Sequence, residues 1–431
     1  MSRVSTKAML WAYRFGVGAL TPAASALLHW RRSRGKEDPT RLGERRGHAG
    51  RARPEGPLAW LHGASVGETL AILPLVERLT RRGIAVLVTS GTRTSAQVIA
   101  RRLPPGAIHQ YVPLDVPIYV RRFLDHWRPD IALFAESEIW PNFIVALERR
   151  NIPLVLVNAR LSERSFRRWS KVPDAAETLL SRFACCLAQT PADAERLQRL
   201  GAPRVSVAGN LKFDAPPPPA DPRTVASLQA LTAGRPVWLA ASTHPGEEEI
   251  AIAVHRALAK RFAGLITIVA PRHPQRGAEI AAIARESGLR PARRSEGLQP
   301  DRATDLYIAD TIGEMGLLYR LAPLVFVGGS LVPHGGQNPI EPAKLGVAVL
   351  HGPHVHNFTD VYAALDNAGG ARPVADARAL AGALSELLAD AGTVRTMGRR
   401  GTEAVERLGG ALERTVRAID PFLVGLVRGE G

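Results

Sequence analysis

The residues best suited to chemistry lie in segment 324–344, where an apolar run precedes a glycine-rich loop and then Asn338 and Glu341 at a predicted helix start. Glycines allow close approach of the backbone to a ligand, and free amides at a helix start attract an anion. Glu341 is placed to accept hydrogen bonds from the vicinal hydroxyls of a ribose. The segment therefore predicts a nucleotide site, with a tight turn and a helix cap as the plainer alternative. Its glycines are Gly328, Gly329, Gly335 and Gly336.

A second candidate is Glu68, which follows the apolar run 58–62 and a glycine-containing bend. A carboxylate at the carboxyl end of a parallel strand faces the edge where open α/β sheets bind ligands. We expect Glu68 to act as a general base that takes the proton from an attacking hydroxyl. An acidic residue in a first helical turn also interacts favourably with the helix dipole, so a structural role is the alternative.

Three more polar loops follow predicted strands in the C-terminal half, at residues 241–247, 270–274 and 310–315. Arg272 suits a phosphate or carboxylate because its planar guanidinium can bind two oxygens at once. Gly313 and Glu314 in the last loop could contact a base or a sugar. Each loop alone could be an ordinary connection, but four polar loops at one sheet edge favour a ligand site.

Several motifs are absent from the chain. It has no Asp-x-Asp pair, no GxxxxGK[ST] loop and no histidines paired at ligand spacing. The acidic clamp for a metal that bridges a diphosphate is therefore missing, and we predict neither a catalytic metal nor a cofactor.

The composition is that of a large, cationic globular protein. A chain of 431 residues exceeds one ordinary core, so two domains are expected. The net charge of +16 requires an acidic partner, which could be nucleic acid, anionic lipid or a phosphorylated substrate. Nucleic acid is not expected, because no helix-turn-helix, zinc-finger or RNA-binding signature is present. The only cysteines are adjacent, which excludes a disulfide framework and favours a reduced, intracellular protein.

The N-terminus combines an apolar stretch, residues 8–30, with nine basic residues between positions 31 and 53. Such positive charge strongly disfavours export of the remainder of the chain. We therefore predict an N-terminal membrane anchor, either spanning the bilayer or lying in its interface, with the bulk of the protein remaining cytoplasmic. A cleaved signal peptide is the main alternative.

From residue 55 onward apolar runs alternate with helical patterns, as in repeated βα units. A proline-rich stretch interrupts this alternation, because consecutive prolines suit neither a helix nor a sheet interior. The predicted fold is α/β, with two doubly wound parallel-sheet domains that face a central cleft. The predicted segments are 1–54 (anchor and basic segment), 55–213 (first domain), 214–235 (linker) and 236–431 (second domain). Strands are expected at 58–62, 85–89, 131–134, 154–157, 184–188 and 205–208, then at 237–240, 265–269, 306–308, 324–327 and 348–350.

These motifs, in this order, resemble those of the Kdo transferases (3-deoxy-D-manno-octulosonic acid transferases) of Gram-negative bacteria, which have the two-domain GT-B glycosyltransferase fold. The resemblance covers almost the whole chain. Two departures flank the last motif: many members of the family have His where this chain has Gln337 and Ala where it has Pro342. The proline removes one amide donor. The matching motifs are Gly63–Glu68, Ala135–Asn142, Gly209–Asp214, Ala270–Pro274, Asp310–Glu314, Gly328–Ser330 and Asn338–Glu341.

The resemblance implies transfer of Kdo from CMP-Kdo to a hydroxyl of the lipid A precursor, by an inverting, metal-independent displacement in lipopolysaccharide biosynthesis. Glu68 would be the catalytic base. The implied CMP-Kdo site consists of Pro271, Arg272, Ile312, Gly313, Glu314, Asn338, Pro339, Ile340 and Glu341. Possible supporting residues are Ser65, Glu138, Lys212, Gly328, Gly329 and Ser330.

The expected partners are CMP-Kdo, the lipid A precursor and inner-membrane lipid. Arg93, Arg160 and Arg164 are candidates for contacts with acceptor phosphates, although solvated surface charge explains them equally well. Two other functions stay open: another nucleotide-sugar enzyme on this scaffold, such as a sugar 2-epimerase, and a non-catalytic protein that binds anionic ligands.

Overall fold

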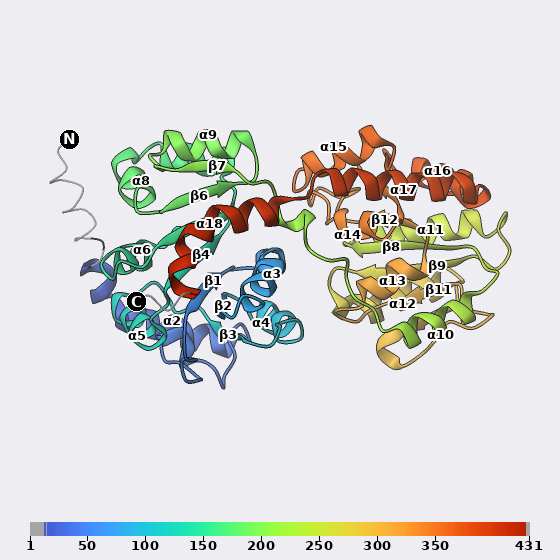
Figure 1. The fold of residues 1–431 in the computed structure, drawn as a ribbon. Coiled ribbons are helices and arrows are strands. Elements are labelled where there is room, and N and C mark those ends of the chain that lie inside the picture. The colour runs from blue at the N-terminus through green and yellow to red at the C-terminus, as the bar shows by residue number, and fades with distance from the viewer. Residues whose placement is uncertain (1–12, 14, 428–431) are drawn as a thin grey trace. The chain divides into compact units, whose positions relative to one another are not determined.

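The computed structural model describes residue 13 and residues 15–427. The chain divides into two compact units, and each contains one parallel sheet. The first, called here the N unit, comprises residues up to Ala215 together with those from Gly409 onward. The second, the C unit, comprises Pro216–Leu408. Two parallel-sheet α/β domains were predicted, and this part of the prediction is confirmed (Figure 1).

The N unit contains a seven-stranded parallel sheet with the order β3-β2-β1-β4-β5-β6-β7. The chain reverses its direction of travel across the sheet between β1 and β4, and such switch points are where α/β sheets bind ligands. The strands are β1 (Leu58–His62), β2 (Ala85–Ser90), β3 (Ala107–Tyr111), β4 (Ile131–Ala135), β5 (Leu154–Ala159), β6 (Cys185–Ala188) and β7 (Val205–Val207). The helices are α2 (Thr21–Ser33), α3 (Val66–Thr80), α4 (Arg93–Ala100), α5 (Pro117–Trp127), α6 (Pro141–Glu148), α7 (Glu163–Trp169), α8 (Pro173–Leu180), α9 (Pro191–Arg199) and α18 (Ala411–Val427).

The C unit contains a second seven-stranded parallel sheet, with the order β10-β11-β9-β8-β12-β13-β14 and a switch point between β8 and β12. The strands are β8 (Val237–Thr243), β9 (Ile266–Pro271), β10 (Pro291–Arg293), β11 (Leu306–Ile308), β12 (Leu324–Val327), β13 (Ala348–His351) and β14 (Ala371–Pro373). The helices are α10 (Pro222–Thr232), α11 (Glu247–Leu258), α12 (Gly277–Glu286), α13 (Met315–Leu321), α14 (Ile340–Lys344), α15 (Thr359–Ala368), α16 (Ala377–Ala389) and α17 (Ala391–Arg407).

The final helix, α18, belongs to the N unit, so the predicted second domain 236–431 extends too far. Its apolar face completes the core beside α3, where Val416, Ile419 and Leu423 are buried. The Asp214 carboxylate accepts hydrogen bonds from the amides of Gly410 (2.6 Å) and Leu412 (2.7 Å), which fixes the start of the helix. In Figure 1 this helix is the red one that lies among the N-unit elements.

The predicted linker, 214–235, is also too long. Its second half forms α10 within the C unit, where the Asp221 side chain caps the helix by accepting from the Thr224 amide (3.0 Å). Leu228 of α10 is fully buried. An N-cap and a buried leucine outweigh the nearby prolines, since proline is tolerated in the first turn of a helix.

The basic segment before residue 55 is part of the folded N unit rather than a separate piece. Arg45 is buried, and its guanidinium bonds with Glu37 (3.0 Å) and with the carbonyls of Gly91 and Val112. A carboxylate and two carbonyls thus compensate the desolvation of this arginine.

The predicted anchor, residues 8–30, lies partly outside the described residues. Within the described residues, no helix is both long enough and apolar enough to cross a membrane. Leu28 of α2 is fully buried against the N unit. Several apolar side chains of the same segment stay exposed, namely Phe15 (67%), Leu20 (61%), Leu27 (46%) and Trp30 (47%).

Candidate active site

Glu68 lies in the first turn of α3, at the carboxyl end of β1 and beside the switch point of the N-unit sheet. The Ser65 hydroxyl accepts from the Glu68 amide (3.3 Å) and donates to its carboxylate (2.7 Å). The Ala64 amide donates to the other carboxylate oxygen (2.8 Å). Ser65 thus caps α3, and the hydrogen bonds from Ser65 and Ala64 hold the Glu68 carboxylate in one orientation.

Two further carboxylates, Glu136 and Glu138, follow β4, the strand that pairs with β1. Burial raises the pKa of Glu68 above its usual value, and the negative charges of Glu136 and Glu138 raise it further. The hydrogen bonds from Ser65 and Ala64 act in the opposite direction. A carboxylate with a raised pKa accepts a proton more readily, which is what a general base requires.

The Glu138 carboxylate lies between an indole ring and an imidazole ring. Trp140 donates its indole proton to the carboxylate (2.6 Å), and Nε2 of the buried His62 lies 3.5 Å from it. Burial alone would raise the pKa of Glu138, but the interactions with His62 and Trp140 outweigh it and hold the pKa below its usual value. Glu138 is thus a fixed negative charge beside Glu68 and not a second proton acceptor.

Glu136 forms an ion pair with Lys212, whose Nζ lies 2.8 Å from its Oε1. Glu136 has φ of 54°, a left-handed conformation that costs a non-glycine residue about 1 kcal/mol or more. Lys212 lies in a short 3-10 turn whose amides are held by the side chains of Asn158 (2.9 Å) and Asn210 (3.0 Å). The predicted Lys212 is therefore paired with Glu136, whose charge acts on Glu68, as does that of the predicted Glu138. Sequence reasoning did not single out Glu136.

In the C unit, the glycine-rich loop after β12 folds around the buried carboxylate of Glu247. This carboxylate accepts hydrogen bonds from four amides, those of His244 (2.9 Å), Gly329 (2.7 Å), Ser330 (3.0 Å) and Leu331 (3.0 Å). A side chain at Gly328 would approach the Ser242 carbonyl to 2.7 Å. The amides of Gly329 and Ser330, two possible supporting residues, are thus bonded within the protein, and this part of the loop has a structural role.

Ser330 has a structural role as well. Its side chain is fully buried, donates to the Val327 carbonyl (2.5 Å) and accepts from the Gly352 amide (2.8 Å). It thereby ties the loop after β12 to the loop after β13. Ser330 can therefore support the site only by holding these two loops together, because its hydroxyl already donates one hydrogen bond and accepts another within the protein.

A histidine cluster lies at the same edge, where β8, β9 and β12 end. The His244 ring stacks on His334 at 4.2 Å and lies 6.1 Å from His273. Burial lowers the pKa of His244 to about 4, and repulsion from the two histidines and from Arg272 and Arg276 contributes. His244 is therefore neutral at pH 7, within surroundings that attract an anion.

Arg272 is the available cation of this cluster. Arg276 is engaged by Glu248 (3.1 Å) and Glu279 (3.0 Å). The exposed Arg272 side chain forms no hydrogen bond or ion pair within the described part of the chain. It follows Pro271, the last residue of β9, and so stands at the carboxyl edge, as predicted.

Two of the predicted residues after β11, Gly313 and Glu314, line a cavity of about 200 Å³ together with the start of α10. The Glu314 carboxylate is held by both Nε and Nη2 of Arg294 (2.5 Å each), and the hydrogen bonds from Arg294 lower its pKa. Ile312 is exposed (56%). Sequence reasoning missed Arg294, which orients Glu314 from a separate loop. The cavity is lined by Pro219, Ala220, Asp221, Thr224, Gly313, Glu314 and Leu317.

The last group of predicted residues, Asn338–Glu341, lies at the start of α14. The Asn338 side chain accepts from the Ile340 amide (3.0 Å), which caps this short helix. The half-buried Glu341 lies near Tyr319, whose pKa is raised well above its usual value by burial and by this carboxylate. With Pro339 and Ile340 buried, only the polar members of this motif are positioned to meet a ligand.

Taken together, the predicted C-unit residues come from the carboxyl ends of β11, β9 and β12, which with β8 form four adjacent strands. Parallel strands end at one sheet edge, so these loops share one side of the C unit.

The three arginines proposed for acceptor phosphates are not brought together. Arg93 follows β2 and donates to the Gly35 carbonyl (2.7 Å), whereas Arg160 and Arg164 follow β5. The strands β1 and β4 separate these loops, about 14 Å at 4.8 Å per strand.

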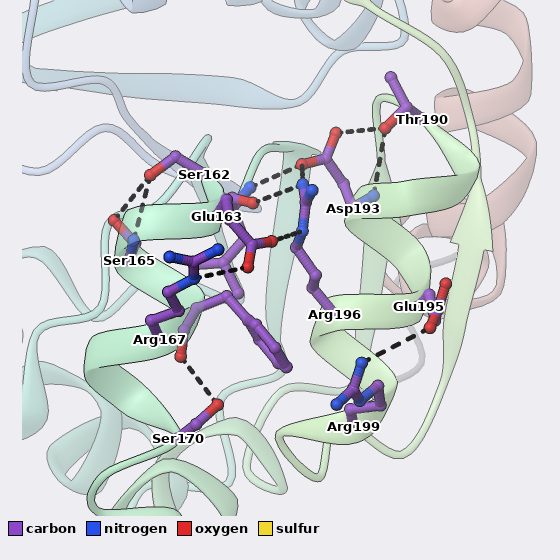
Figure 2. A network of polar contacts seen from close by, with 12 residues as sticks. Ser162, Glu163, Ser165, Arg167, Ser170, Thr190, Asp193, Glu195, Arg196 and Arg199 are labelled. Atoms are coloured by element: carbon purple, nitrogen blue, oxygen red, sulfur yellow. Dashed lines mark hydrogen bonds and ion pairs between the residues drawn. The ribbon is translucent and has the colours of Figure 1, made fainter.

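Helix α7, which carries Arg164, is fastened to the N unit by polar contacts. Figure 2 shows Glu163 bonded to Arg167 along α7 (2.9 Å) and to Arg196 of α9 (3.3 Å). These pairs fix a helix that buries none of its own side chains.

Two parallel-sheet α/β units, each with polar loops at one sheet edge, give this chain a two-domain fold of GT-B type. The same fold occurs in the solved structure of a putative UDP-N-acetylglucosamine 2-epimerase from Listeria monocytogenes, with a TM-score of 0.58. The alignment covers 85% of this chain and 96% of the epimerase, at 16% identity, which is a likeness of fold.

Sequence comparison identifies the family. A family model described as 3-deoxy-D-manno-octulosonic-acid transferase (kdotransferase) matches residues 40–215. The chain is 35% identical over 390 residues to the 3-deoxy-D-manno-octulosonic acid transferase of Haemophilus influenzae, covering 89% of this chain and 91% of the relative. It is 38% identical over 411 residues to that of Bordetella pertussis, covering 91% and 95%. The chain belongs to the family of 3-deoxy-D-manno-octulosonic acid transferases, which are glycosyltransferases.

Proposed function

We propose that this protein transfers Kdo from CMP-Kdo to a hydroxyl of the lipid A precursor, with Glu68 as the general base. The observation that carries the assignment of the base is the Glu68 carboxylate itself, fixed by Ser65 and Ala64 and given a raised pKa by burial and two neighbouring carboxylates. The names and identities of the relatives support the substrate pair.

The reaction is a single displacement. The acceptor oxygen forms a bond to the anomeric carbon of Kdo while Glu68 removes its proton. The bond from that carbon to the phosphate oxygen breaks, and CMP leaves with the electron pair. One step of this kind inverts the configuration at the anomeric carbon.

The donor would be held by the loops after β9, β11 and β12. Arg272 and the surroundings of His244 would stabilise the leaving phosphate, because preorganised donors act most strongly where charge develops. Ile312 to Glu314 and Asn338 to Glu341 would contact the nucleoside and sugar. CMP carries one phosphate, so we propose that these groups suffice without a metal ion or cofactor.

We also propose that the protein works at the cytoplasmic face of the inner membrane. The exposed apolar side chains of residues 15–30, followed by Arg31, Arg32 and Arg34, have the composition of a segment that lies in a membrane interface. An acylated acceptor would be available to the enzyme there.

The test is a transfer assay with CMP-Kdo and a tetraacylated disaccharide acceptor. Glu68→Gln keeps the shape of the side chain and removes its basicity, so transfer should fall by roughly 10²- to 10⁴-fold while CMP-Kdo binding is retained. Glu77→Gln, in the same helix but away from the site, is the control. Near-normal turnover by Glu68→Gln would remove Glu68 from this role, and release of a 2-epimerised sugar without acceptor glycosylation would favour the epimerase alternative.

A further inference from the structure

The N unit has a second hollow that the proposed mechanism does not use. A groove of about 430 Å³ lies between α5 and α6, a size typical of small-molecule sites. Its apolar lining includes Ile118, Val120 and Ala146. Arg121 and Arg149 line it as well, from α5 and α6 respectively.

The two arginines are uncommitted. Arg121 and Arg149 are exposed, and neither forms a hydrogen bond or ion pair with another residue in the described parts of the chain. Arg150 also lines the groove but is paired with Asp125 (2.5 Å). Two free guanidinium groups above an apolar floor suit a ligand that carries both a phosphate and hydrocarbon.

One end of the groove lies close in the chain to the candidate active site. Helix α6 begins at Pro141, directly after the loop that carries Glu138 and Trp140, and its second residue, Asn142, lines the groove. From Asn142 to Arg149 the helix rises about 10 Å. The groove therefore follows α6 from its first turn, which comes directly after the loop of Glu138, to the arginines at its other end.

Asn142 adds a polar group at the head of the groove. Its Nδ2 donates to the Asp115 carbonyl (2.6 Å), which settles the orientation of the amide. Its Oδ1 is buried and has no hydrogen-bond donor within the described residues. A buried acceptor without a partner costs free energy, so a ligand hydroxyl or amide that reached it would be bound favourably.

We propose that the groove between α5 and α6 is the acceptor subsite, with an acceptor phosphate on Arg121 and Arg149 and an acyl chain on the apolar floor. The proposal rests on the proposed transferase function. Because the groove starts at the helical turn that follows the loop of Glu138, we assign it to the acceptor and not to a phospholipid of the surrounding bilayer.

The test is the double variant Arg121→Gln/Arg149→Gln in the full-length protein. We expect the dissociation constant and the KM for the acceptor to rise on the order of tenfold or more, because two charge-assisted phosphate contacts are lost. The kcat and the KM for CMP-Kdo should not change. Arg101→Gln/Arg122→Gln removes the same charge from exposed positions outside the groove and should leave every constant unchanged.

An acceptor without phosphate groups distinguishes direct phosphate contacts with Arg121 and Arg149 from a general effect of the protein's positive charge. It should bind the wild type and the double variant equally, since the lost arginines have nothing to contact. Unchanged acceptor affinity in the double variant, or an equal loss in the control variant, would overturn the proposal.

Binding to vesicles of phosphatidylcholine with 30% phosphatidylglycerol distinguishes the other source of lipid phosphate. We expect the double variant and the control to bind these vesicles equally. A loss confined to vesicle binding would assign the groove to bilayer lipid and overturn the proposal. The affinity for the acceptor is measured directly, so the groove is tested even if the wild type shows no transfer. An absence of transfer by the wild type would count against the proposed function alone.

Discussion

The basicity of Glu68 results from opposing influences at the scale of single residues. Ser65 and Ala64 orient the carboxylate, but their hydrogen bonds stabilise its charged form and so reduce its affinity for a proton. Burial and the charges of Glu136 and Glu138 have the opposite effect, and they prevail. The site thus combines a fixed base with a raised pKa.

This balance predicts the pH dependence of activity. Glu68 must be ionised to accept a proton, so kcat/KM should fall as the pH drops through the Glu68 pKa. Because Glu136 raises this pKa, Glu136→Gln should lower it and move the acid limb of the profile to lower pH. The measured quantity is the pH at which kcat/KM falls on the acidic side, regardless of the maximum value of kcat/KM. Glu77→Gln should leave this pH unchanged. A limb that stays or moves upward in Glu136→Gln would contradict this account.

Among contacts of single residues, only those between near neighbours in the chain can be read from local sequence. Ser65 and Glu68 are three residues apart, the spacing of a capping box, and their contact follows from helix geometry. The pair Glu136 and Lys212 joins positions 76 residues apart and depends on a left-handed backbone, which no local pattern indicates. The assigned roles of the site residues stay predictions.

At the scale of elements, Glu247 connects α11 with the loop after β12. Four amides converge on one buried carboxylate, so the loop holds its shape through a residue from another element. The glycine pair Gly328 and Gly329 permits this close packing.

Glu247→Ala should leave four buried amides without an acceptor, which we expect to destabilise the C unit by at least about 3 kcal/mol. Amide hydrogen exchange at residues 328–331 should accelerate, and CMP-Kdo binding should weaken. Glu249→Ala is the matched control in the same helical turn, because it loses one cap contact, with the Gly246 amide, at a cost of about 1 kcal/mol or less. Equal exchange rates in the two variants would show that the loop does not depend on Glu247.

Three strands, β3, β10 and β14, were not predicted, and all three lie at sheet edges. An edge strand has one neighbouring strand, and these three are only partly buried, so they lack the continuous apolar runs of central strands. The eleven predicted strands were all found, most of them in the sheet interior, where burial on both faces leaves a clear pattern.

At the scale of the whole molecule, the domain boundaries were the least accurate prediction. The βα pattern starts a second time after the proline-rich stretch, which indicates two domains. The sequence of a single amphipathic helix, however, does not show which of the two hydrophobic cores its apolar face packs against. Only the contacts of Val416, Ile419 and Leu423 beside α3 assign α18 to the N unit.

This assignment predicts how fragments behave. The fragment 216–408 should fold alone, give a cooperative unfolding transition and bind CMP. The longer fragment 216–431 should be less soluble, because it exposes the apolar face that α18 buries in the N unit. Higher solubility and stability of the longer fragment would indicate that α18 belongs with the C unit.

The exposed apolar side chains of α2 predict membrane affinity of the entire protein. Leu27→Asp/Trp30→Asp should weaken binding to vesicles containing phosphatidylglycerol by at least about tenfold, because each buried apolar side chain contributes about 1.5 to 3 kcal/mol. Leu231→Asp alters a comparably exposed leucine of α10 and should have no effect. Equal vesicle binding by wild type and double variant, measured by co-sedimentation, would argue against an interfacial role of α2.

The return of the chain to the N unit at Gly409 has a consequence for biosynthesis. The ribosome delivers the seven strands of the first sheet early, yet the helix that covers one side of that sheet is synthesised only after the entire C unit. At typical translation rates, the intervening Pro216–Leu408 takes on the order of ten to forty seconds to synthesise. During that interval the nascent polypeptide carries an uncovered apolar surface beside α3, which makes it a natural client for chaperones.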